Sequence, residues 1–325
     1  MKENAVLSFA AGFWGRYKKQ IIAVLLIFAL FLVGEIATGS FLSIEQVLLT
    51  VKVAAIVAMF GLCQLIVIAA GGSGLDLSVG YCATIAAIFA GKAMDGQNGN
   101  LLVGILICLG FGIAVGIVNG VFIAYLKLPA LVITVAVSNI IQGVINVYTA
   151  GHAIDGKPSP VLVTLMGKMT GIWPNILLPL VILAAITMWI LYKTKWGVKL
   201  LAVGSNENAA YLCGINVKRV RFTAYVCSGA LAGLMGLVLL GYMNMAFKDM
   251  GSIYVMPSIA AVVVGGVSMN GGEGNYVGVI LGAIVLQTLT NLFYALGLGE
   301  AGKWAGIGLV LLIMLIAYVR DTRKR

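Results

Sequence analysis

The sequence has few charged residues for its length. Only 10% of the 325 residues are charged, whereas 61% are hydrophobic, and the mean hydropathy is +1.07. A soluble domain carries roughly 25% charged residues, which cover its water-facing surface. Because so little charge is available here, most of the outer surface must face lipid. The 42 glycines agree with this reading, since small residues allow membrane helices to approach closely.

Side chains that perform chemistry or bind metals are also scarce. His152 is the only histidine, which argues against a Ser-His catalytic cluster or a histidine metal site. The five cysteines show no CxxC spacing, and four of them fall in or beside apolar runs, where they are expected to pack as small apolar residues. We therefore predict no catalytic residue, no metal and no cofactor.

Acidic residues are outnumbered by basic ones, 11 to 21, which gives a formal net charge of +10. The position of the basic residues excludes a nucleic-acid-binding domain. They form short clusters between apolar runs, as the positive-inside rule predicts for a membrane protein, and do not line one face of a domain.

Ten apolar segments are predicted to be membrane spans, some of them short or broken. A membrane helix needs about 20 mostly apolar residues. The segments are Ile21–Ile36, Val47–Ala70, Val79–Gly91, Leu101–Leu126, Ala130–Tyr148, Ile176–Tyr192, Phe222–Tyr242, Tyr254–Met269, Tyr276–Leu296 and Lys303–Val319. The sequence thus predicts an all-α polytopic membrane protein, a single transmembrane domain over residues 1–325.

Ten spans place both termini on one side, and the basic residues indicate which side. Fifteen fall in the segments that are cytoplasmic in this arrangement: Lys2, Arg16, Lys18, Lys19, Lys127, Lys193, Lys195, Lys199, Lys218, Arg219, Arg221, Arg320, Arg323, Lys324 and Arg325. Five fall in external segments, namely Lys92, Lys157, Lys168, Lys248 and Lys303, and Lys52 lies within a span. This bias predicts cytoplasmic N- and C-termini.

Two glycine-rich stretches, residues 71–80 and 265–274, interrupt the apolar pattern on the predicted cytoplasmic side. Non-helical backbone at membrane depth is tolerated only where it is buried in protein or lines water. Within these breaks Asp76, Ser78, Gly265 and Gly266 are candidate gating residues. Two interpretations of Asp76 and Ser78 remain open: they cap the following helix, or they take part directly in gating or in the substrate path.

The longest predicted cytoplasmic loop contains a short helix. Ser205 and Asn206 supply a polar cap, the small residues after them favour a helix, and Gly214 provides its end. Isolated helices of this length are marginally stable in water, so docking into a groove of a soluble partner would stabilise it. The alternative is that the helix lies flat on the membrane. The loop spans residues 199–217.

Taken in order, six motifs make the chain resemble the permeases of ribose-type ABC sugar importers, within the branched-chain amino acid and ribose permease superfamily. They are Gly74-Leu-Asp-Leu-Ser-Val-Gly80, Asn119-Gly120 with Leu128-Pro129, Gly204-Ser-Asn-Glu-Asn-Ala-Ala210, Gly214-Ile-Asn216, Ala260-Ala-Val-Val-Val-Gly-Gly266 and Gly271-Gly-Glu-Gly274. They cover nearly the whole chain from about residue 70. One departure is the Gly-Gly-Ser-Gly-Leu-Asp segment, where the family usually has Gly-Gly-Ile-Asp.

The resemblance implies a bacterial inner-membrane protein that works in an assembly. The implied partners are two cytoplasmic ATPase subunits, a second permease that is identical or paralogous, an external sugar-binding protein and membrane lipid, with no nucleic acid. It also implies that residues 206–214 form a coupling helix that enters a cleft of the ATPase. The coupling candidates are Ser205, Asn206, Glu207, Asn208, Ala209, Ala210, Leu212 and Gly214.

Polar side chains within two spans are candidates for the translocation path. Thr134, Ser138 and Gln142 recur every four residues in the fifth span, and Asn139 and Asn146 lie beside them; Gln287 and Asn291 are four apart in the ninth. Hydrogen bonding between helices is the alternative role for all seven. No carboxylate lies on either stripe, which weighs against proton-coupled transport.

The sequence thus predicts a permease subunit that hydrolyses no ATP itself and passes a ribose-like monosaccharide received from an external binding protein. The solute itself is left open: a pentose, a hexose, a nucleoside or a furanose-like signal molecule. A secondary transporter is the main alternative, because broken helices also occur there. An intramembrane enzyme is disfavoured by the lack of paired catalytic groups.

Overall fold

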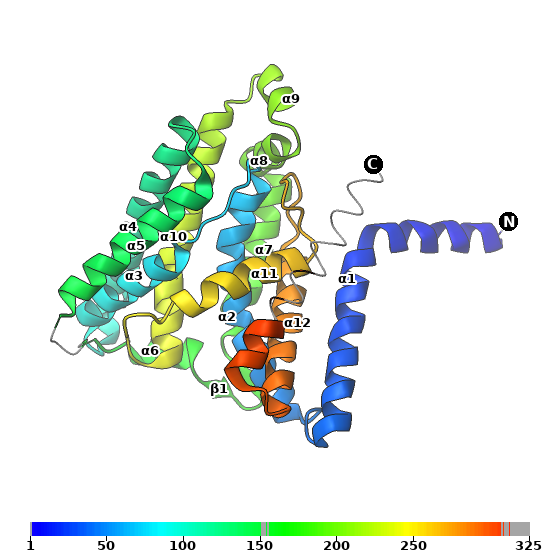
Figure 1. Ribbon diagram of the computed structural model, residues 1–325, viewed down its shortest axis with the longest axis horizontal. Coiled ribbons are helices and arrows are strands. Elements are labelled where there is room, and N and C mark those ends of the chain that lie inside the picture. Colours follow the sequence, from blue (N-terminus) through cyan, green and yellow to red (C-terminus); the bar gives the residue numbers. More distant parts are fainter. Residues whose placement is uncertain (1, 151–153, 155, 307, 309–311, 313–325) are drawn as a thin grey trace.

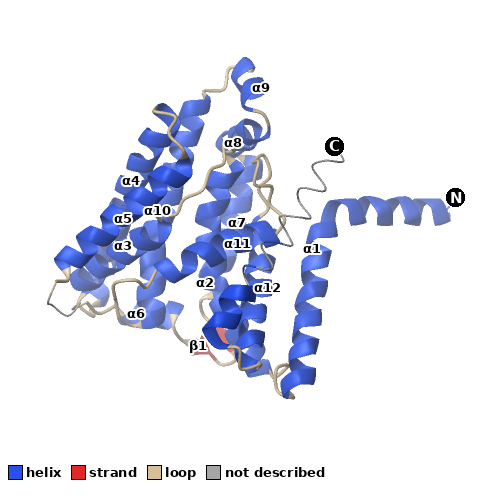
Figure 2. Ribbon diagram, in the orientation of Figure 1, coloured by secondary structure: helices blue, strands red, loops and turns tan. Residues whose placement is uncertain are grey.

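A computed structural model describes residues 2–150, 154, 156–306, 308 and 312, with side chains from residue 19 onward. Helices make up most of the described chain (Figures 1 and 2). Its two short strands, β1 (Met169–Thr170) and β2 (Trp173–Pro174), pair antiparallel in a small hairpin. The all-α polytopic architecture predicted from the sequence is therefore confirmed.

Helices differ strongly in length. The long ones are α1 (Lys2–Thr38), α2 (Ile44–Ala69), α4 (Leu101–Gly120), α5 (Ala130–Tyr148), α7 (Leu177–Lys193), α10 (Val217–Met243) and α12 (Tyr276–Ala295). The short ones are α3 (Val79–Met94), α6 (Pro160–Met166), α8 (Lys195–Ser205), α9 (Glu207–Leu212) and α11 (Val255–Val264), with single turns η1 (Asn98–Asn100) and η3 (Ser252–Tyr254) and a π-helical turn η2 (Val121–Tyr125). We call the two ends of the bundle the α9 end and the α6 end (Figure 1).

Nine of the ten predicted spans correspond to helices. Six described helices are long and apolar enough to cross a membrane, and α7 with α8 forms a seventh candidate that is bent by 72°. The third and eighth predicted spans are the short apolar helices α3 and η3–α11. The eighth ends at Val264 instead of Met269, because Gly266 adopts a φ of +80° and turns the chain.

Most of the tenth predicted span lies outside the described residues, which include a helical segment over residues 299–306. His152 and the C-terminal Arg320, Arg323, Lys324 and Arg325 also lie outside them.

Helix α2 forms the centre of the bundle. Of its most apolar stretch, 83% is buried inside the protein, whereas the corresponding share is 17% for α1, 28% for α4 with its flanking turns and 33% for α5. The first turn of α2 is fixed by Ser43, whose side chain accepts a hydrogen bond from the Gln46 nitrogen. Helices α10, α11 and α12 pack around α2, so its apolar residues build the core while α1, α4 and α5 present apolar faces to lipid.

Among the described helices, α4 and α10 make the most extensive contact, through small residues on both sides. Gly112 and Gly116 of α4 lie four residues apart and face Gly229 and Gly233 of α10, which are also four apart. A side chain at Gly229 would overlap the backbone of α4. The two helices therefore approach backbone to backbone, as small-residue motifs allow in membrane proteins.

The units α2–α3–α4 and α10–α11–α12 repeat one arrangement in opposite directions. In each, a long helix is followed by a non-helical segment, a short helix and a second long helix; the non-helical segments are residues 70–78 and 244–251. Helix α4 packs along α10, and α12 packs along α2. Helix α2 ends at the α9 end, where α10 begins (Figure 1). This is the inverted-repeat organisation that many transporters share, with broken helices at the repeat interface.

Candidate functional site

The first break returns into the bundle as an extended segment alongside α2. The Asp76 nitrogen donates to Gln64 Oε1 (3.2 Å), and Gln64 Nε2 donates to the Asp76 carbonyl oxygen (2.7 Å). Gly74 lies directly against the carbonyl oxygen of Val67. These contacts satisfy backbone groups inside the protein, which meets the condition for non-helical chain at membrane depth.

Asp76 is fully buried, and its carboxylate accepts hydrogen bonds from the first break and from helices α4 and α10. Oδ1 accepts hydrogen bonds from the Ser78 nitrogen (3.1 Å) and hydroxyl (2.6 Å) and a longer one from Asn119 Nδ2 of α4 (3.4 Å). Oδ2 accepts from the Ser228 hydroxyl of α10 (3.0 Å). Asn119 Nδ2 also donates to the Ser78 hydroxyl (2.8 Å). Asp76 thus fixes the break to α4 and α10.

Ser78 occupies the position before α3, yet its side chain makes no capping hydrogen bond to that helix. Its hydroxyl is committed to Asp76 instead. Gln64, Asn119 and Ser228 were not among the predicted site residues, although a glutamine or asparagine within an apolar run is itself a signal for a buried polar contact.

The two breaks meet the end of α8 at a junction formed by Gly71, Gly204, Gly271 and Gly272, which we call the glycine junction. The Gly272 nitrogen donates to the Ala69 carbonyl oxygen at the end of α2 (3.1 Å). A side chain at Gly204 would overlap that same oxygen and the Gly272 nitrogen. Three distant segments therefore touch through backbone alone, directly beside α9.

Helix α9 has defined signals at both ends. Asn206 is its cap and accepts a hydrogen bond from the Ala209 nitrogen (3.0 Å), whereas Ser205 belongs to α8 and donates to Leu201. At the other end Gly214 has a φ of +78°, and the Gly214 and Ile215 nitrogens donate to Tyr211 and Ala210. This is the Schellman arrangement, which needs a residue that tolerates the left-handed conformation.

The outer face of α9 is exposed and partly apolar. Leu212 is 83% exposed and Tyr211 71%, and Asn208 and Ala209 are also exposed, whereas Ala210 is buried against the bundle. Exposed aromatic and aliphatic side chains on a polar loop are typical of a surface that binds a protein partner.

A salt bridge connects α9 to α10 beside the first break. Glu207 Oε2 lies 2.8 Å from Arg221 Nη2 at the start of α10, with the arginine side chain only 19% exposed. The guanidinium also lies against Gly72. Arg221 therefore links α9 to α10 and to the segment that leads to Asp76.

Basic residues predicted to share one side gather at the α9 end. Lys19 donates to the Gly266 carbonyl oxygen (2.7 Å) and to Glu273 (3.1 Å). Lys127 and Lys218 line a groove of about 1060 Å³ between α9, η2 and the end of α2. At the α6 end, Lys92 donates to Tyr148 and the Gly96 nitrogen donates to the Lys157 carbonyl oxygen. The two predicted sets of loops therefore lie at opposite ends.

The polar stripe of α5 divides into two parts. Thr134 and Ser138 are buried; the Thr134 hydroxyl donates to Ala130 of its own helix, and Ser138 donates to the Leu77 carbonyl oxygen (3.4 Å). Asn139 and Asn146 are exposed and Gln142 is half-buried. Ser138 thus contacts the first break, whereas Asn139, Gln142 and Asn146 form a polar strip toward the outside of the described chain.

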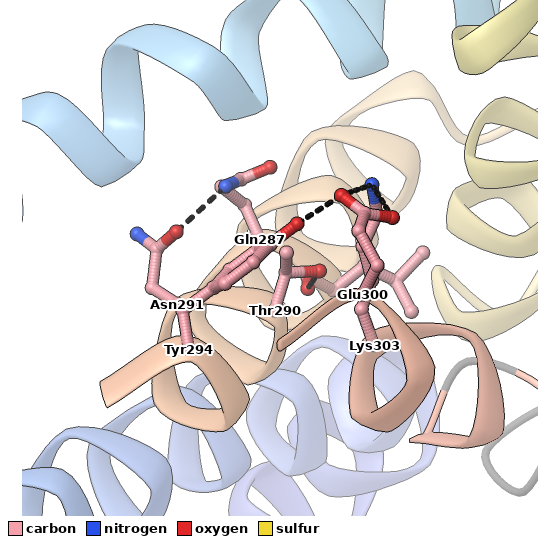
Figure 3. A network of polar contacts seen from close by, with 7 residues as sticks. Gln287, Thr290, Asn291, Tyr294, Glu300 and Lys303 are labelled. Atoms are coloured by element: carbon pink, nitrogen blue, oxygen red, sulfur yellow. Dashed lines mark hydrogen bonds and ion pairs between the residues drawn. The ribbon is translucent and has the colours of Figure 1, made fainter. Parts of the chain in front are cut away.

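The polar pair of α12 forms hydrogen bonds within the bundle. Gln287 Nε2 donates to Asn291 Oδ1 (2.9 Å; Figure 3), and Asn291 Nδ2 donates to the Thr50 hydroxyl of α2 (2.8 Å). Asn291 thus connects two helices, while Gln287 also lines a small pocket near the α6 end. Among the described residues, no group of three or more His, Cys, Asp and Glu side chains is placed to hold a metal ion.

Over residues 43–319 the chain matches the family described as branched-chain amino acid transport system / permease component. The match covers most of the chain, which therefore belongs to this family of transport permeases and is a multi-pass membrane protein.

Several relatives are named as importers of a sugar or of a signal molecule. The ribose import permease protein of Bacillus subtilis is 33% identical over 92% of this chain and 91% of its own length. The fructose import permease protein of Rhizobium meliloti is 28% identical over 89% of this chain and 82% of its own. The autoinducer 2 import system permease protein of Shigella flexneri is 28% identical over 92% and 86%. No solved structure matches the chain.

Proposed function

We propose that this chain is the membrane-spanning subunit of an ATP-driven importer for a monosaccharide, and that α9 is the element through which ATP hydrolysis in a partner drives it. The chain performs no catalysis in this proposal. Its assembly contains two ATPase subunits at the α9 end, a second permease, identical or paralogous, and a sugar-binding protein at the α6 end of the bundle.

The main support for the proposal is that α9 is a short, capped helix with exposed apolar side chains. A six-residue helix with both ends fixed presents Tyr211 and Leu212 outward, although such a short helix has little stability of its own. Docking into a cleft of a soluble subunit would bury these side chains. The Glu207–Arg221 salt bridge and the glycine junction then supply a rigid path from the docked helix to both breaks.

The sugar class is supported by the relatives, whose names include ribose and fructose. The clustering of basic residues at the α9 end supports a cytoplasmic location for that end, with both termini inside. In a bacterium this permease would lie in the inner membrane, because only that membrane faces the cytoplasmic ATP.

The proposal is tested by Leu212→Lys and Glu207→Lys in the assembled transporter. Both variants are expected to insert normally but to lose ATPase binding in pull-down and to reduce uptake of labelled sugar about tenfold or more. Leu212→Lys disrupts a side chain at the centre of the proposed interface, which costs roughly 2 kcal/mol. Glu207→Lys replaces the salt bridge to Arg221 by repulsion between like charges. Leu42→Lys is the matched control, since Leu42 is also exposed but lies at the α6 end. Normal ATPase binding and normal uptake in both α9 variants would refute the proposed coupling role.

A further inference from the structure

A small pocket lies between α2, α11 and α12 near the α6 end. Its volume is about 180 Å³. Sites for drug-sized ligands occupy roughly 300–1,000 Å³, so this one limits its occupant to a small solute. The helical segment over residues 299–306 returns toward α12 beside it, and Lys303 from this segment contributes to the lining.

One wall of the pocket is apolar and rigid. Tyr254, Val57 and Leu286 contribute to it. The Tyr254 ring stacks on Phe60 with centroids 5.4 Å apart and an angle of 11° between the planes. A stacked aromatic pair is a firm surface, and the C–H face of a sugar ring is the kind of apolar surface that packs against it.

Helix α12 also adds hydrogen-bonding groups to the pocket lining. The Gln287 amide nitrogen donates to Asn291, while its oxygen accepts no hydrogen bond within the part of the chain that the structure describes. The Thr290 hydroxyl donates to the Leu286 carbonyl oxygen (2.8 Å) and keeps its own oxygen free to accept. Both side chains line the pocket and are suited to receive hydroxyl groups.

The charge of Lys303, which lines the pocket, is balanced by Glu300. Lys303 Nζ lies 3.4 Å from both Glu300 carboxylate oxygens, and the Tyr294 hydroxyl donates to the same carboxylate (Figure 3). The hydrogen bond from Tyr294 and the charge of Lys303 hold the pKa of Glu300 below its ordinary value of 4.5, so Glu300 is ionised at neutral pH. The Lys303 charge is thereby compensated, which favours a neutral occupant over an anion.

We propose that this pocket is a binding station for one neutral monosaccharide at the outer end of the import path, with Gln287 and Thr290 accepting sugar hydroxyls and Tyr254 packing against the ring. The inference rests on the proposed function for its substrate class. The polar residues singled out in the sequence did not include Thr290, Tyr254 or Lys303, which the proposal places in this site.

Cysteine labelling of the assembled transporter in lipid nanodiscs tests the proposal. Thr290→Cys and Thr288→Cys form a matched pair, because both threonines are buried on α12 and donate to their own helix, but only Thr290 lines the pocket. Both are made with Cys213→Ser and Cys227→Ser, since the other three native cysteines are buried. Ethyl methanethiosulfonate is the reagent, with D-ribose and D-fructose as protecting solutes.

We expect Thr290→Cys to react and Thr288→Cys to remain unreactive. A sugar that the assembly imports should slow labelling of the Thr290→Cys variant about tenfold at ten times its Kd, by mass action. D-Ribose 5-phosphate should not protect. An unchanged labelling rate alongside normal sugar uptake would overturn the pocket assignment, and protection by the phosphate ester alone would overturn the neutral class.

A second variant keeps the test decisive if Thr290→Cys does not assemble. Gln287→Leu should lower sugar uptake roughly fivefold, the worth of one hydrogen bond, without changing ATPase binding. Thr50→Val is its control, because it removes the bond to Asn291 outside the pocket. Equal uptake in the two variants would overturn the assignment. A native assembly that imports neither sugar with ATP would instead count against the proposed function.

Discussion

At the scale of single residues, the most informative position is Asp76. A carboxylate in an apolar run is costly at membrane depth unless hydrogen bonds or a counter-charge stabilise it. The sequence showed that Asp76 needs a partner, and it placed Ser78 nearby. It could not show that the partners come from α4 and α10, because Asn119 and Ser228 lie 43 and 152 residues away.

Replacing Asp76 by asparagine is expected to destabilise the folded protein strongly. The new amide group would face the Ser228 hydroxyl or the Ser78 donors, and each buried polar group left unpaired costs about 1–3 kcal/mol. The midpoint of thermal unfolding in detergent, followed by intrinsic fluorescence, should fall clearly.

Asp95→Asn is the control for this substitution. Asp95 is exposed and has a φ of +44°, a conformation that asparagine also tolerates. Equal unfolding midpoints for the two variants would mean that the Asp76 network contributes nothing to stability.

At the scale of elements, the capping signals were the most reliable guide. The run of polar and small residues predicted a short helix, and α9 is found there with Gly214 at its end. Of the two predicted capping residues, only Asn206 caps α9, because Ser205 continues α8. The α5 stripe shows what periodicity does not predict. The four-residue spacing places Thr134 and Ser138 on one face of the helix, but it does not show that this face is buried against α3 and the first break.

The glycine junction is an element-level contact, and Gly204→Ala should disrupt it. The added methyl group would overlap the end of α2 and the second break, so we expect reduced thermal stability and a loss of sugar uptake of about tenfold or more, because strain from overpacking costs typically 1–3 kcal/mol.

Gly110→Ala in α4 provides the comparison for the junction variant. Nothing lies within 4 Å of a side chain at Gly110, so this helix-favouring change should be neutral or slightly stabilising. Uptake in Gly204→Ala that matches Gly110→Ala would show that close contact at the junction is dispensable.

At the scale of the whole molecule, composition and hydropathy predicted the fold class, and nine predicted spans have helical counterparts. The inverted pairing of α4 with α10 and of α12 with α2 was not predictable, since hydropathy gives the order of spans but not their neighbours. The glycines that create these contacts looked in the sequence like a general preference for small residues. Only the arrangement in space shows that two breaks and one loop converge beside α9.

The most direct test of the account concerns what α9 touches. A photoreactive amino acid at Leu212 in the assembled transporter, activated in membrane vesicles, should form an adduct with the ATPase subunit. The same probe at Leu42 should not. An adduct between Leu212 and the external sugar-binding protein, or labelling of Leu212→Cys by a membrane-impermeant reagent added from outside, would contradict the account.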